Sequence, residues 1–507
     1  MNDIVSVKDF GAKGDGINVA TTATISSGSN ALTAAGAAFT AADVGKLILV
    51  PGAGTAGGVL KTTVATFTNA THITLAATAT TALSATPTNI LYGTDDHSAI
   101  TAAQAAAVSA GNGLFWPSGN YLTSLALFLG SDHTRHVNFG GVTITFTGSG
   151  SAISFDAGAT SGLLFDISFG SRECPFKIVG NPSATNAVFA RSVHHSSINI
   201  IARDFTDTAL NLNFSVCSEF FVKMSVNDGG AFLVQPGAAL ISQPRVSGET
   251  VTDCDFYIIA EGISGTGVQM GGTVRCRFRG TSEGNVSGGG GVYEGPGCVD
   301  NIFTNFHCES NAGYDWSLQG SSQTHLDMCC GNHATSSLVL QNVQRARITG
   351  GEYYAVLVDA ASGNCCLDYV GYVNSFTISS ATTSYRRIFD GTGAFIADKV
   401  LNPTITAPTY ANSWVDFGGG IRAGGYYKTA ANVVHLCGTI KNGTVGSKAF
   451  TLPAGFRPSA VLFFPATNPF AGTMSFMIQV DPNGDVIPQS GANSSCALDS
   501  VAFLAEQ

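Results

Sequence analysis

The 507-residue sequence has few charged residues, few tryptophans and no long apolar run. Only 11% of its residues are charged, and three are tryptophan. No run of 18 apolar residues occurs and no charged-then-apolar leader precedes Val5, so we expect neither a membrane span nor a signal peptide. Without a leader, the twelve cysteines are expected to be reduced thiols of a chain that folds in cytoplasm, rather than a disulfide framework.

The chain also lacks an excess of positive charge. Its net charge is −10 and its pI is about 5.4. A surface that follows the phosphates of nucleic acid needs an excess of lysine and arginine, so nucleic acid is not an expected partner. An acidic shell suits a soluble particle component or a binder of neutral sugars, and it repels acidic polysaccharides unless a local basic patch intervenes.

Short apolar runs separated by glycine, asparagine and serine are abundant. Glycine alone accounts for 61 residues, and 44% of the chain is hydrophobic. This pattern predicts many short strands and an all-β fold, and it is too apolar for disorder. The length allows two to four domains, or one elongated domain with appendages.

One motif is divided between two distant segments. The sequence VKDFGAKGDG at residues 7–16 stops abruptly, and GTDDHSAI at 93–100 and GLFWPSGNYLTS at 113–124 continue it. Together they predict a strand, a glycine turn, a capped helix, a short strand, a turn and a strand. As a phosphate loop, the glycines lack the GK[ST] ending and the helix that should follow directly.

The helix in this motif has clear boundaries in the sequence. Asp95 or Thr94 is the predicted N-cap of a helix that begins near His97. The alanine-rich stretch has high helix propensity up to Ala110, and Gly111 provides the left-handed stop.

The divided motif resembles the N-terminal segment of right-handed parallel β-helix proteins of the pectate-lyase-like superfamily, especially bacteriophage tailspikes. The resemblance implies that residues 1–16 and 93–124 begin and cap a β-helix. Such a solenoid needs a cap because its terminal coil otherwise exposes an apolar face and unpaired backbone groups. It also implies a homotrimer made in the host cytoplasm and carried on the virion tail, which contacts tail or baseplate proteins and a host surface polysaccharide.

Residues 17–92 interrupt the motif as a unit of their own. Alternating apolar residues predict a small inserted β-domain: Leu47, Leu49, Val64, Phe67, Ile73 and Leu75. The segment resembles a module that interrupts the same motif in other tailspike-like proteins. It is either a spacer or N-terminal cap, or a site that docks to the tail.

Cysteines mark a repeat between about residues 125 and 400. Four similar segments, CSEFFV, CDFYII, CRFRGT and CVDNIF, begin at Cys217, Cys254, Cys276 and Cys298. The last two intervals are 22 residues, as is the interval from Cys308 to Cys330, and His195 lies 22 residues before Cys217. A 22-residue period fits one coil of a parallel β-helix, whose strands stack about 4.8 Å apart.

The register predicts further features of residues 125–400. The longer interval from Cys217 to Cys254 predicts a loop at 235–249. Stacked cysteines are expected to pack as small buried residues. A metal or redox site is the alternative, but CysxxCys spacing is missing and the adjacent pairs at 329–330 and 365–366 point to opposite faces of a strand.

The same register brings carboxylates together. Glu261 and Glu283 both lie seven residues after their cysteines, with Asn305 expected one coil later, so the two glutamates should sit about 5 Å apart. Such a pair can divide the roles of acid and ionised carboxylate in a retaining glycosidase, whereas an inverting enzyme needs a wider gap. Wider pairings involve Asp228, Glu249, Asp253, Asp255, Glu294, Asp300 and Glu309. Solvated turn residues are the alternative interpretation.

A lyase is the competing chemistry, because it needs a base and a cation that neutralises a uronate carboxylate. The alternating Arg275, Arg277 and Arg279 share a strand face, as do Arg345 and Arg347. Candidate bases are His307, His325, Tyr353 and Tyr354. Arg277, Arg279, Tyr293 and Trp316 are the predicted substrate-binding residues, although solvent-facing arginines and packed aromatics would look the same in sequence.

Residues 401–507 follow a different pattern. LNPTITAPTY, near residues 401–410, predicts a linker, and short alternating strands with NG, GG and PNG turns predict an antiparallel β-sandwich. The stretch AFTLPAGFRPS resembles C-terminal modules of phage tail fibres and tailspikes that aid trimerisation or bind receptor sugar. Trp414, Tyr426 and Tyr427 are candidates for sugar contact or for core packing.

The sequence therefore predicts a tailspike-like protein that binds a host surface polysaccharide and depolymerises it by glycoside hydrolysis. A polysaccharide lyase and a non-catalytic adhesin or structural spike are the alternatives. Neither a cofactor nor a metal site is predicted.

Overall fold

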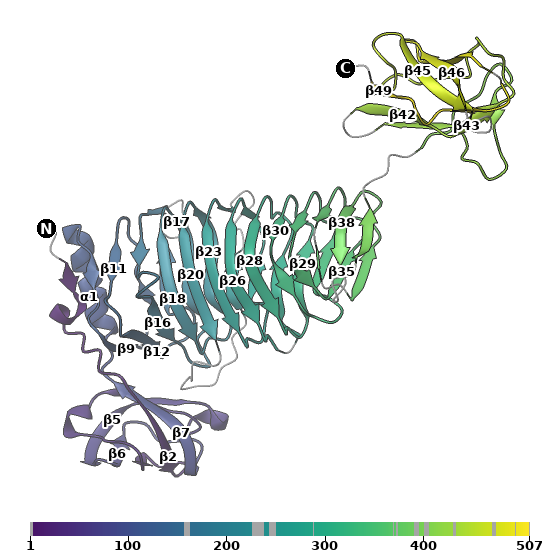
Figure 1. Ribbon diagram of the computed structural model, residues 1–507. Coiled ribbons are helices and arrows are strands. Elements are labelled where there is room, and N and C mark those ends of the chain that lie inside the picture. The colour runs from purple at the N-terminus through teal and green to yellow at the C-terminus, as the bar shows by residue number, and fades with distance from the viewer. Residues whose placement is uncertain are drawn as a thin grey trace. The chain divides into compact units, whose positions relative to one another are not determined.

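The computed structural model describes residues 4–156, 163–225, 238–242, 250–286, 288–368, 370–371, 374–389, 395–399, 405–428, 432–468, 473–491 and 493–505. The chain forms two compact units, Met1–Val400 and Leu401–Gln507. The first unit contains a stack of coils, a helix at the N-terminal end of the stack and an inserted barrel (Figure 1). None of the helices in the described residues has the length and apolarity to cross a membrane.

Each coil of the first unit contributes strands to two long sheets whose strands pair in parallel, apart from the antiparallel last pair β38–β39. The larger sheet has 19 strands: β1 (Val5–Ser6), β8 (Leu114–Phe115), β9 (Gly119–Thr123), β11 (Arg135–Val137), β12 (Val142–Phe146), β15 (Ser168–Phe169), β16 (Phe176–Val179), β18 (Ser197–Arg203), β20 (Glu219–Ser225), β23 (Asp255–Glu261), β26 (Arg277–Glu283), β28 (Ile302–Glu309), β30 (His325–Asp327), β31 (Cys330–Gly331), β33 (Arg347–Thr349), β34 (Glu352–Tyr353), β36 (Cys366–Asp368), β38 (Ser384–Phe389) and β39 (Phe395–Lys399).

The second sheet has 14 strands, and it closes the other side of each coil. They are β10 (Leu127–Phe128), β13 (Ile153–Asp156), β14 (Leu164–Phe165), β17 (Asn186–His194), β19 (Thr208–Val216), β21 (Ala238–Ser242), β22 (Val251–Thr252), β24 (Val268–Met270), β25 (Thr273–Val274), β27 (Gly290–Glu294), β29 (Tyr314–Gln319), β32 (Leu338–Gln341), β35 (Ala355–Val358) and β37 (Ser375–Ile378). The molecule is therefore a right-handed parallel β-helix, as the motif predicted.

Alternate residues of each strand point into a continuous core, because successive side chains of a strand face opposite sides. In-register residues then stack from coil to coil. Phe220, Phe256, Phe278 and Phe303 form such a stack, with successive ring centroids 4.9, 4.8 and 4.6 Å apart. Each ring buries apolar area and gains stacking contacts with its neighbours.

The cysteine register is correct at some positions and wrong at others. Cys254 and Cys276 are buried neighbours, since Asp255 pairs with Arg277. Cys217 is exposed at a left-handed corner (φ 51°), and Ser218 takes its place in the buried row, because Glu219 pairs with Asp255. All twelve cysteines are free thiols.

Two other cysteine assignments are also displaced. Arg277 pairs with Ile302, so the partner of Cys276 in the next coil is Asn301, and Cys298 is three residues out of register. His307 pairs with Cys330, so Cys308 lies one residue beyond the position opposite Cys330. The predicted loop at 235–249 is partly wrong, since its residues Ala238–Ser242 form strand β21; its other residues lie outside the described ranges.

The two halves of the divided motif meet in space. Val5 pairs with Leu114, and the Asp96 carboxylate accepts hydrogen bonds from the backbone N–H groups of Lys13 (2.6 Å) and Gly14 (3.0 Å). Burial raises the pKa of Asp96 to about 6, against the opposing effect of these two hydrogen bonds.

Helix α1 (His97–Ala110) places Ile100, Ala103 and Ala107 in the β-helix core and ends at Gly111 (φ 64°). Its N-cap is Asp96 rather than Asp95 or Thr94. The Asp96 carboxylate is turned to the Lys13–Gly14 loop, and Asp95 accepts instead from the His97 N–H at 3.2 Å.

The insertion forms a closed six-stranded antiparallel barrel with its own core. Its strands are β2 (Ile17–Ile25), β3 (Ala31–Ala34), β4 (Leu47–Val50), β5 (Leu60–Asn69), β6 (His72–Leu75) and β7 (Leu83–Gly93), with 3₁₀ turns at Ala41–Asp43 and Thr55–Gly57; a third lies at Val7–Phe10, before the barrel. Leu47 and Leu49 lie outside the barrel core and pack with Leu91 against Leu122 of the β-helix.

The second unit is a small β-sandwich with a separate core. Its strands are β40 (Val415–Asp416), β41 (Gly425–Lys428), β42 (Val433–Cys437), β43 (Thr439–Lys441), β44 (Phe450–Thr451), β45 (Leu462–Asn468), β46 (Thr473–Val480), β47 (Asp485–Ser490), β48 (Cys496–Ala497) and β49 (Ala502–Leu504). Trp414 and Tyr426 are buried in this core, and Tyr427 stacks on His435 at 4.9 Å.

Candidate functional site

Three carboxylates form one row on the outer face of the 19-stranded sheet. Glu261 pairs with Glu283, and Glu283 pairs with Glu309 in the following coil. The pairing confirms the predicted register of Glu261 and Glu283. Neighbouring carboxylates in such a row lie on strands about 4.8 Å apart, and alternate ones about twice that.

The third member of this row differs from the expected Asn305. The register between β26 and β28 shifts after Phe278, and Asn305 is the exposed extra residue, with a left-handed backbone (φ 49°). This bulge moves the following residues of β28 along, so that Glu309 faces Glu283.

Each carboxylate of the row ends its strand and precedes a left-handed residue: Gly262 (φ 68°), Gly284 (φ 64°) and Ser310 (φ 56°). The row therefore crosses the sheet at the C-terminal ends of its strands, where the three glutamate side chains are partly exposed. Nε2 of His307 lies 3.0 Å from Oε2 of Glu309. His307 shares this face with the row, so an imidazole is available beside the carboxylates.

A pocket of about 290 Å³ lies at the other end of the same strands. Its lining combines guanidinium, carboxylate and aromatic groups: Arg172, Asn199, Glu219, Phe220, Phe221, Asp255, Phe256, Tyr257, Arg277 and Arg279. Arg279 and Glu283 are four residues apart on one strand, so the pocket begins about 13 Å from the carboxylate row.

The charges in this pocket are only partly paired. Nη1 of Arg277 lies 3.9 Å from Oδ1 of Asp255. The Arg172 guanidinium lies 4.2 Å from the centre of the Tyr257 ring, a cation–π contact. Among the described residues, no carboxylate lies within ion-pair distance of Arg172 or Arg279.

Arg275 does not share the face of Arg277 and Arg279. It occupies a left-handed corner (φ 53°) before β26, and its guanidinium donates two 2.8 Å hydrogen bonds to Asp253. These hydrogen bonds lower the pKa of Asp253. The predicted three-arginine face therefore reduces to Arg277 and Arg279.

The predicted substrate-binding set divides into three places. Arg277 and Arg279 line the pocket, but Tyr293 lies on β27 of the other sheet. Trp316 is fully buried, and its Nε1–H donates to the Cys330 carbonyl at 2.8 Å, so its prediction as a groove wall was wrong. Tyr353 is likewise buried, and Asp228 lies outside the described residues.

Glu294, another candidate catalytic carboxylate, does not lie on the surface. Its carboxylate is fully buried inside the β-helix and accepts hydrogen bonds from Asn301 Nδ2 (2.8 Å) and Thr324 Oγ1 (2.6 Å). Burial raises its pKa. It has no access to a polysaccharide.

Sequence reasoning missed Arg172, Glu219, Phe221 and Tyr257. Phe221 pairs with Tyr257, and Tyr257 pairs with Arg279, so a register without the one-residue error at Cys217 would have placed these three in one row. Arg172 reaches the pocket from the connection between β15 and β16, where the repeat gives no signal.

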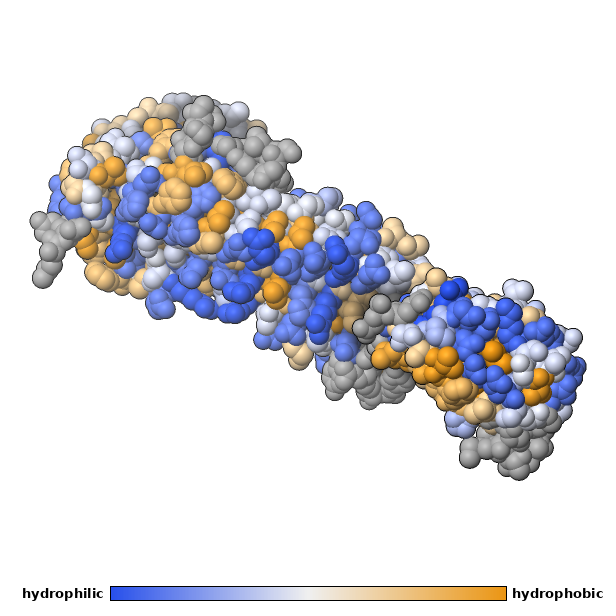
Figure 2. Space-filling model, turned by 90° about the horizontal axis from the view of Figure 1, so that it is seen from above, coloured by the Kyte–Doolittle hydropathy of each residue, from blue (hydrophilic) through white to orange (hydrophobic). Residues whose placement is uncertain are grey.

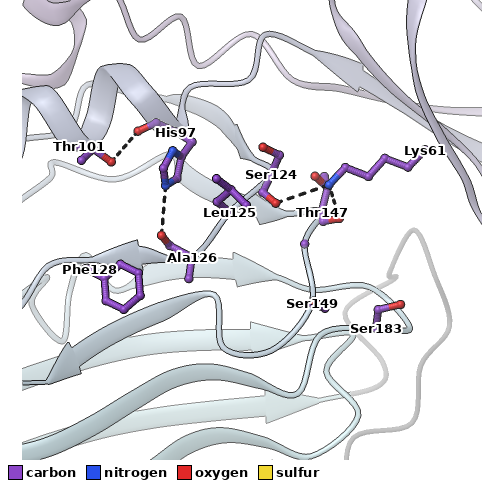
Figure 3. Close-up of a pocket in the computed structure, with 11 residues that line it drawn as sticks. Lys61, His97, Thr101, Ser124, Leu125, Ala126, Phe128, Thr147, Ser149 and Ser183 are labelled. Atoms are coloured by element: carbon purple, nitrogen blue, oxygen red, sulfur yellow. Dashed lines mark hydrogen bonds between the residues drawn. The ribbon is translucent and has the colours of Figure 1, made fainter. Parts of the chain in front are cut away.

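A cavity of about 690 Å³ lies between barrel strand β5, helix α1 and the first coils (Figure 3). The ammonium of Lys61 donates to the carbonyls of Thr147 (2.9 Å) and Ser124 (3.5 Å), joining barrel and β-helix. Burial lowers the pKa of Lys61. The described lining residues include no carboxylate, so this cavity offers no paired acid and base.

Among the described residues, no group of three or more histidine, cysteine, aspartate or glutamate side chains is arranged to hold a metal ion.

On the face shown in Figure 2, hydrophobic residues form several separate patches among hydrophilic ones.

No family model and no curated protein matches this sequence. Solved structures similar to the chain include ORF18 of Geobacillus virus E2 (11% identity, 96% of this chain and 76% of that one, TM-score 0.34). Others are tailspike protein 3 of bacteriophage CBA120 (12%, 63% of each chain, TM-score 0.36) and the Streptococcus pneumoniae surface adhesin PfbA (12%, 77% and 98%, TM-score 0.37).

These likenesses are distant, and the fold rests on the pairing of the coils themselves. The chain is a right-handed parallel β-helix protein. Its candidate site is the outer face of the 19-stranded sheet, where the carboxylate row and the Arg172–Tyr257–Arg279 pocket share strands β23 and β26.

Proposed function

We propose that this β-helix protein is a tailspike-like protein that binds a host surface polysaccharide and cleaves it by glycoside hydrolysis. The observation that carries the proposal is the in-register row of Glu261, Glu283 and Glu309. It lies on the same sheet face as a pocket of arginine and aromatic side chains. One part of a chain of sugars would bind in the pocket while another part lies over the carboxylates.

The spacing of the row suits the chemistry of glycosidic bonds. Retaining enzymes place their two carboxyl groups about 5–5.5 Å apart, and inverting enzymes about 6.5–9.5 Å apart. Neighbouring members of the row approach the first spacing and alternate members the second. Glu283 belongs to every neighbouring pair, and we assign it a catalytic role.

Substitution of the row tests this assignment. We expect Glu283→Gln to lower kcat on the host glycan by about 10²–10⁴-fold, the usual range for loss of a general acid or base. Glu261→Gln and Glu309→Gln identify the partner. Reducing-end release measures turnover, and the anomer of the first product distinguishes a neighbouring pair from an alternate one.

Glu352→Gln is the matched control, because Glu352 is an exposed carboxylate on β34 of the same sheet and outside the row. Its turnover should equal that of the unaltered chain. Full turnover in all three row variants would eliminate the row as the catalytic site. Glycan binding without any cleavage would instead favour a non-catalytic adhesin.

A lyase is the second candidate, and His307 favours it. His307 is exposed, lies 3.0 Å from Glu309 and shares a face with Arg279, which has no carboxylate partner among the described residues. An imidazole base and a free guanidinium are what removal of a proton next to a uronate carboxylate requires. Ultraviolet absorbance of an unsaturated product, lost in His307→Gln, would identify this reaction.

A further inference from the structure

We infer that the polysaccharide is acidic, and that its anionic group occupies the arginine pocket while an uncharged linkage lies over the carboxylate row. The anionic group is a carboxylate or a phosphate substituent of one sugar unit. The inference rests on the proposed function and adds the chemical class of the polysaccharide and its position on the sheet. Its basis is the distribution of charge over the outer face of the 19-stranded sheet.

Outward side chains form four rows across strands β20, β23 and β26, and charge is divided unevenly between these rows. The first row contains Glu219, Asp255 and Arg277, and the last contains Glu261 and Glu283. The two middle rows contain no carboxylate on these strands: their members are Phe221, Tyr257 and Arg279, and Lys223, Ile259 and Thr281. An anion therefore meets cations and uncharged groups in the middle of the face, and like charge at the last row.

Two guanidinium groups lie beside Tyr257 in the first of the middle rows. Arg172 lies over the Tyr257 ring, 4.2 Å from its centre, and Arg279 occupies the in-register position on the next strand. Among the described residues, neither arginine has a carboxylate within ion-pair distance. The chain has 34 acidic residues against 24 lysines and arginines, yet it places none of these acids against the two guanidinium groups. We therefore expect the anion that they bind to come from the ligand.

The two carboxylates of the pocket do not neutralise its arginines. Oδ1 of Asp255 lies 3.9 Å from Nη1 of Arg277 in the first row, and Glu219 pairs in register with Asp255. The lining thus has three guanidinium groups and two carboxylates, an excess of one positive charge on a chain of net charge −10. This local excess attracts an acidic polysaccharide to one place on a surface that otherwise repels it.

The side chains of the pocket also match an acidic sugar in shape. A guanidinium presents paired N–H donors that fit a carboxylate or a phosphate, and the cation–π contact with Tyr257 holds the guanidinium of Arg172 in place. The rings of Phe221 and Tyr257 are partly exposed, and they stack with their centroids 5.6 Å apart and 19° between their planes. Such rings offer an apolar surface to the apolar face of a sugar.

The distance between pocket and row determines which sugar carries the charge. Arg279 and Glu283 are four residues apart on β26, which is about 13 Å and longer than one sugar ring. The sugar bound at the arginines is therefore not the one whose linkage lies over the glutamates. Like charge at Glu261 and Glu283 disfavours an anionic sugar at the row, so cleavage is expected next to uncharged sugars.

Removal of charge from either partner tests the inference. The probe is the surface polysaccharide of the host in three forms: untreated, with its carboxyl groups reduced by carbodiimide and borohydride, and with its phosphate groups released by hydrofluoric acid. Every chain in the binding assay carries Glu283→Gln, so that binding is measured without cleavage. Arg279→Gln removes the cation from the pocket. The control is Arg135→Gln, because Arg135 is an exposed arginine on β11 of the same sheet and outside the pocket.

Biolayer interferometry measures the affinity of each chain for each form, and circular dichroism verifies folding. We expect one of the two treatments to weaken binding to the chain with Arg279 at least tenfold, as for loss of a hydrogen bond to a charged group. The treatment that does so identifies the anion as a carboxylate or a phosphate. Arg279→Gln should bind all three forms equally and weakly, whereas Arg135→Gln should retain the full difference.

Equal binding of the three forms by the chain with Arg279, or binding of none of them, would overturn the inference. So would a difference between forms that Arg279→Gln retains. The two proposals fail in different ways: a polysaccharide that binds by its charge but is not cut by the chain with Glu283 would contradict hydrolysis alone. One that is bound and cut equally well in all three forms would contradict the acidic class alone.

Discussion

Glu294 is a candidate site residue in the sequence but a fully buried residue in the structure. In the sequence it is one of several acids near the repeat, and in the structure it is enclosed by the coils with Asn301 and Thr324 as hydrogen-bond donors. A carboxyl group without a cation in such a place keeps its proton more readily than in water. Its role is to connect neighbouring coils from the inside.

The raised pKa of Glu294 makes stability depend on pH in a defined direction. The folded chain holds the proton above the ordinary carboxyl pKa of 4.5, where the unfolded chain releases it. Stability is therefore lost as pH rises from about 4.5 toward the folded pKa. Glu294→Gln keeps the shape without the titration, so its thermal midpoint should exceed that of the unaltered chain at pH 7.

The comparison at low pH provides the control. Below pH 4.5 the glutamic acid is neutral in both states, and the two thermal midpoints should converge. A variant that is less stable than the unaltered chain at pH 7 would contradict this account.

Single residues also explain where prediction from sequence succeeded. The interval from Cys254 to Cys276 is a true coil length, and it placed Glu261 opposite Glu283 correctly. Cys217 misled the register by one residue, because a cysteine at a left-handed corner and a cysteine in the core look alike in sequence. Trp316 misled the site prediction, because an aromatic side chain gives no sign of the face it occupies.

Among the elements, the bulge between β26 and β28 has the largest effect on the site. It inserts Asn305 and sets Glu309 opposite Glu283. Gly280 pairs with Phe306, the first residue after the bulge, and its position admits only glycine, since its φ is 130° and a Cβ there would lie 1.8 Å from the Ile258 carbonyl oxygen on β23. A 22-residue repeat predicts coils of equal length, and so it could not predict that the coil between β26 and β28 is longer and contains an extra residue.

We therefore expect Gly280→Ala to destabilise the β-helix. The backbone strain alone costs about 1–3 kcal/mol, and the clash with Ile258 adds to it. Chemical denaturation monitored by circular dichroism measures the loss. Gly284→Ala is the control, because Gly284 is also left-handed (φ 64°) but the nearest atom to its Cβ is 3.9 Å away. Equal losses in the two variants would contradict a steric role for Gly280.

The elements that sequence predicted best are those with local signals. Helix α1 ends where Gly111 predicted, and the insertion forms strands as its alternating residues indicated. Closure of that insertion into a barrel depends on pairing between distant strands, such as β2 with β7, for which the sequence contains no comparable signal.

At the scale of the whole molecule, the chain has separate cores in its two units. Trp316 is buried in the core of the β-helix, and Trp414 is buried in the core of the sandwich. The two cores share no residue, so the units should respond separately to substitution.

Two matched substitutions test this independence. Trp414→Ala should destabilise the sandwich by about 3–5 kcal/mol and leave the β-helix unchanged, and Trp316→Ala should do the reverse. Hydrogen exchange followed peptide by peptide measures each unit within the full chain. Faster exchange in both units from either variant would show that they unfold together.

The chain enters and leaves the inserted barrel at adjacent points, Gly16 and Gly93. Gly16 and Gly93 meet there so closely that a Cβ on Gly93 would lie 2.7 Å from the Gly16 Cα. A chain that departs and returns at one point can exchange the whole intervening module for another, or lose it, with little disturbance to the coils on either side. We therefore expect the coils to tolerate replacement of the barrel at this point, provided that the replacement covers Leu122 as the barrel does.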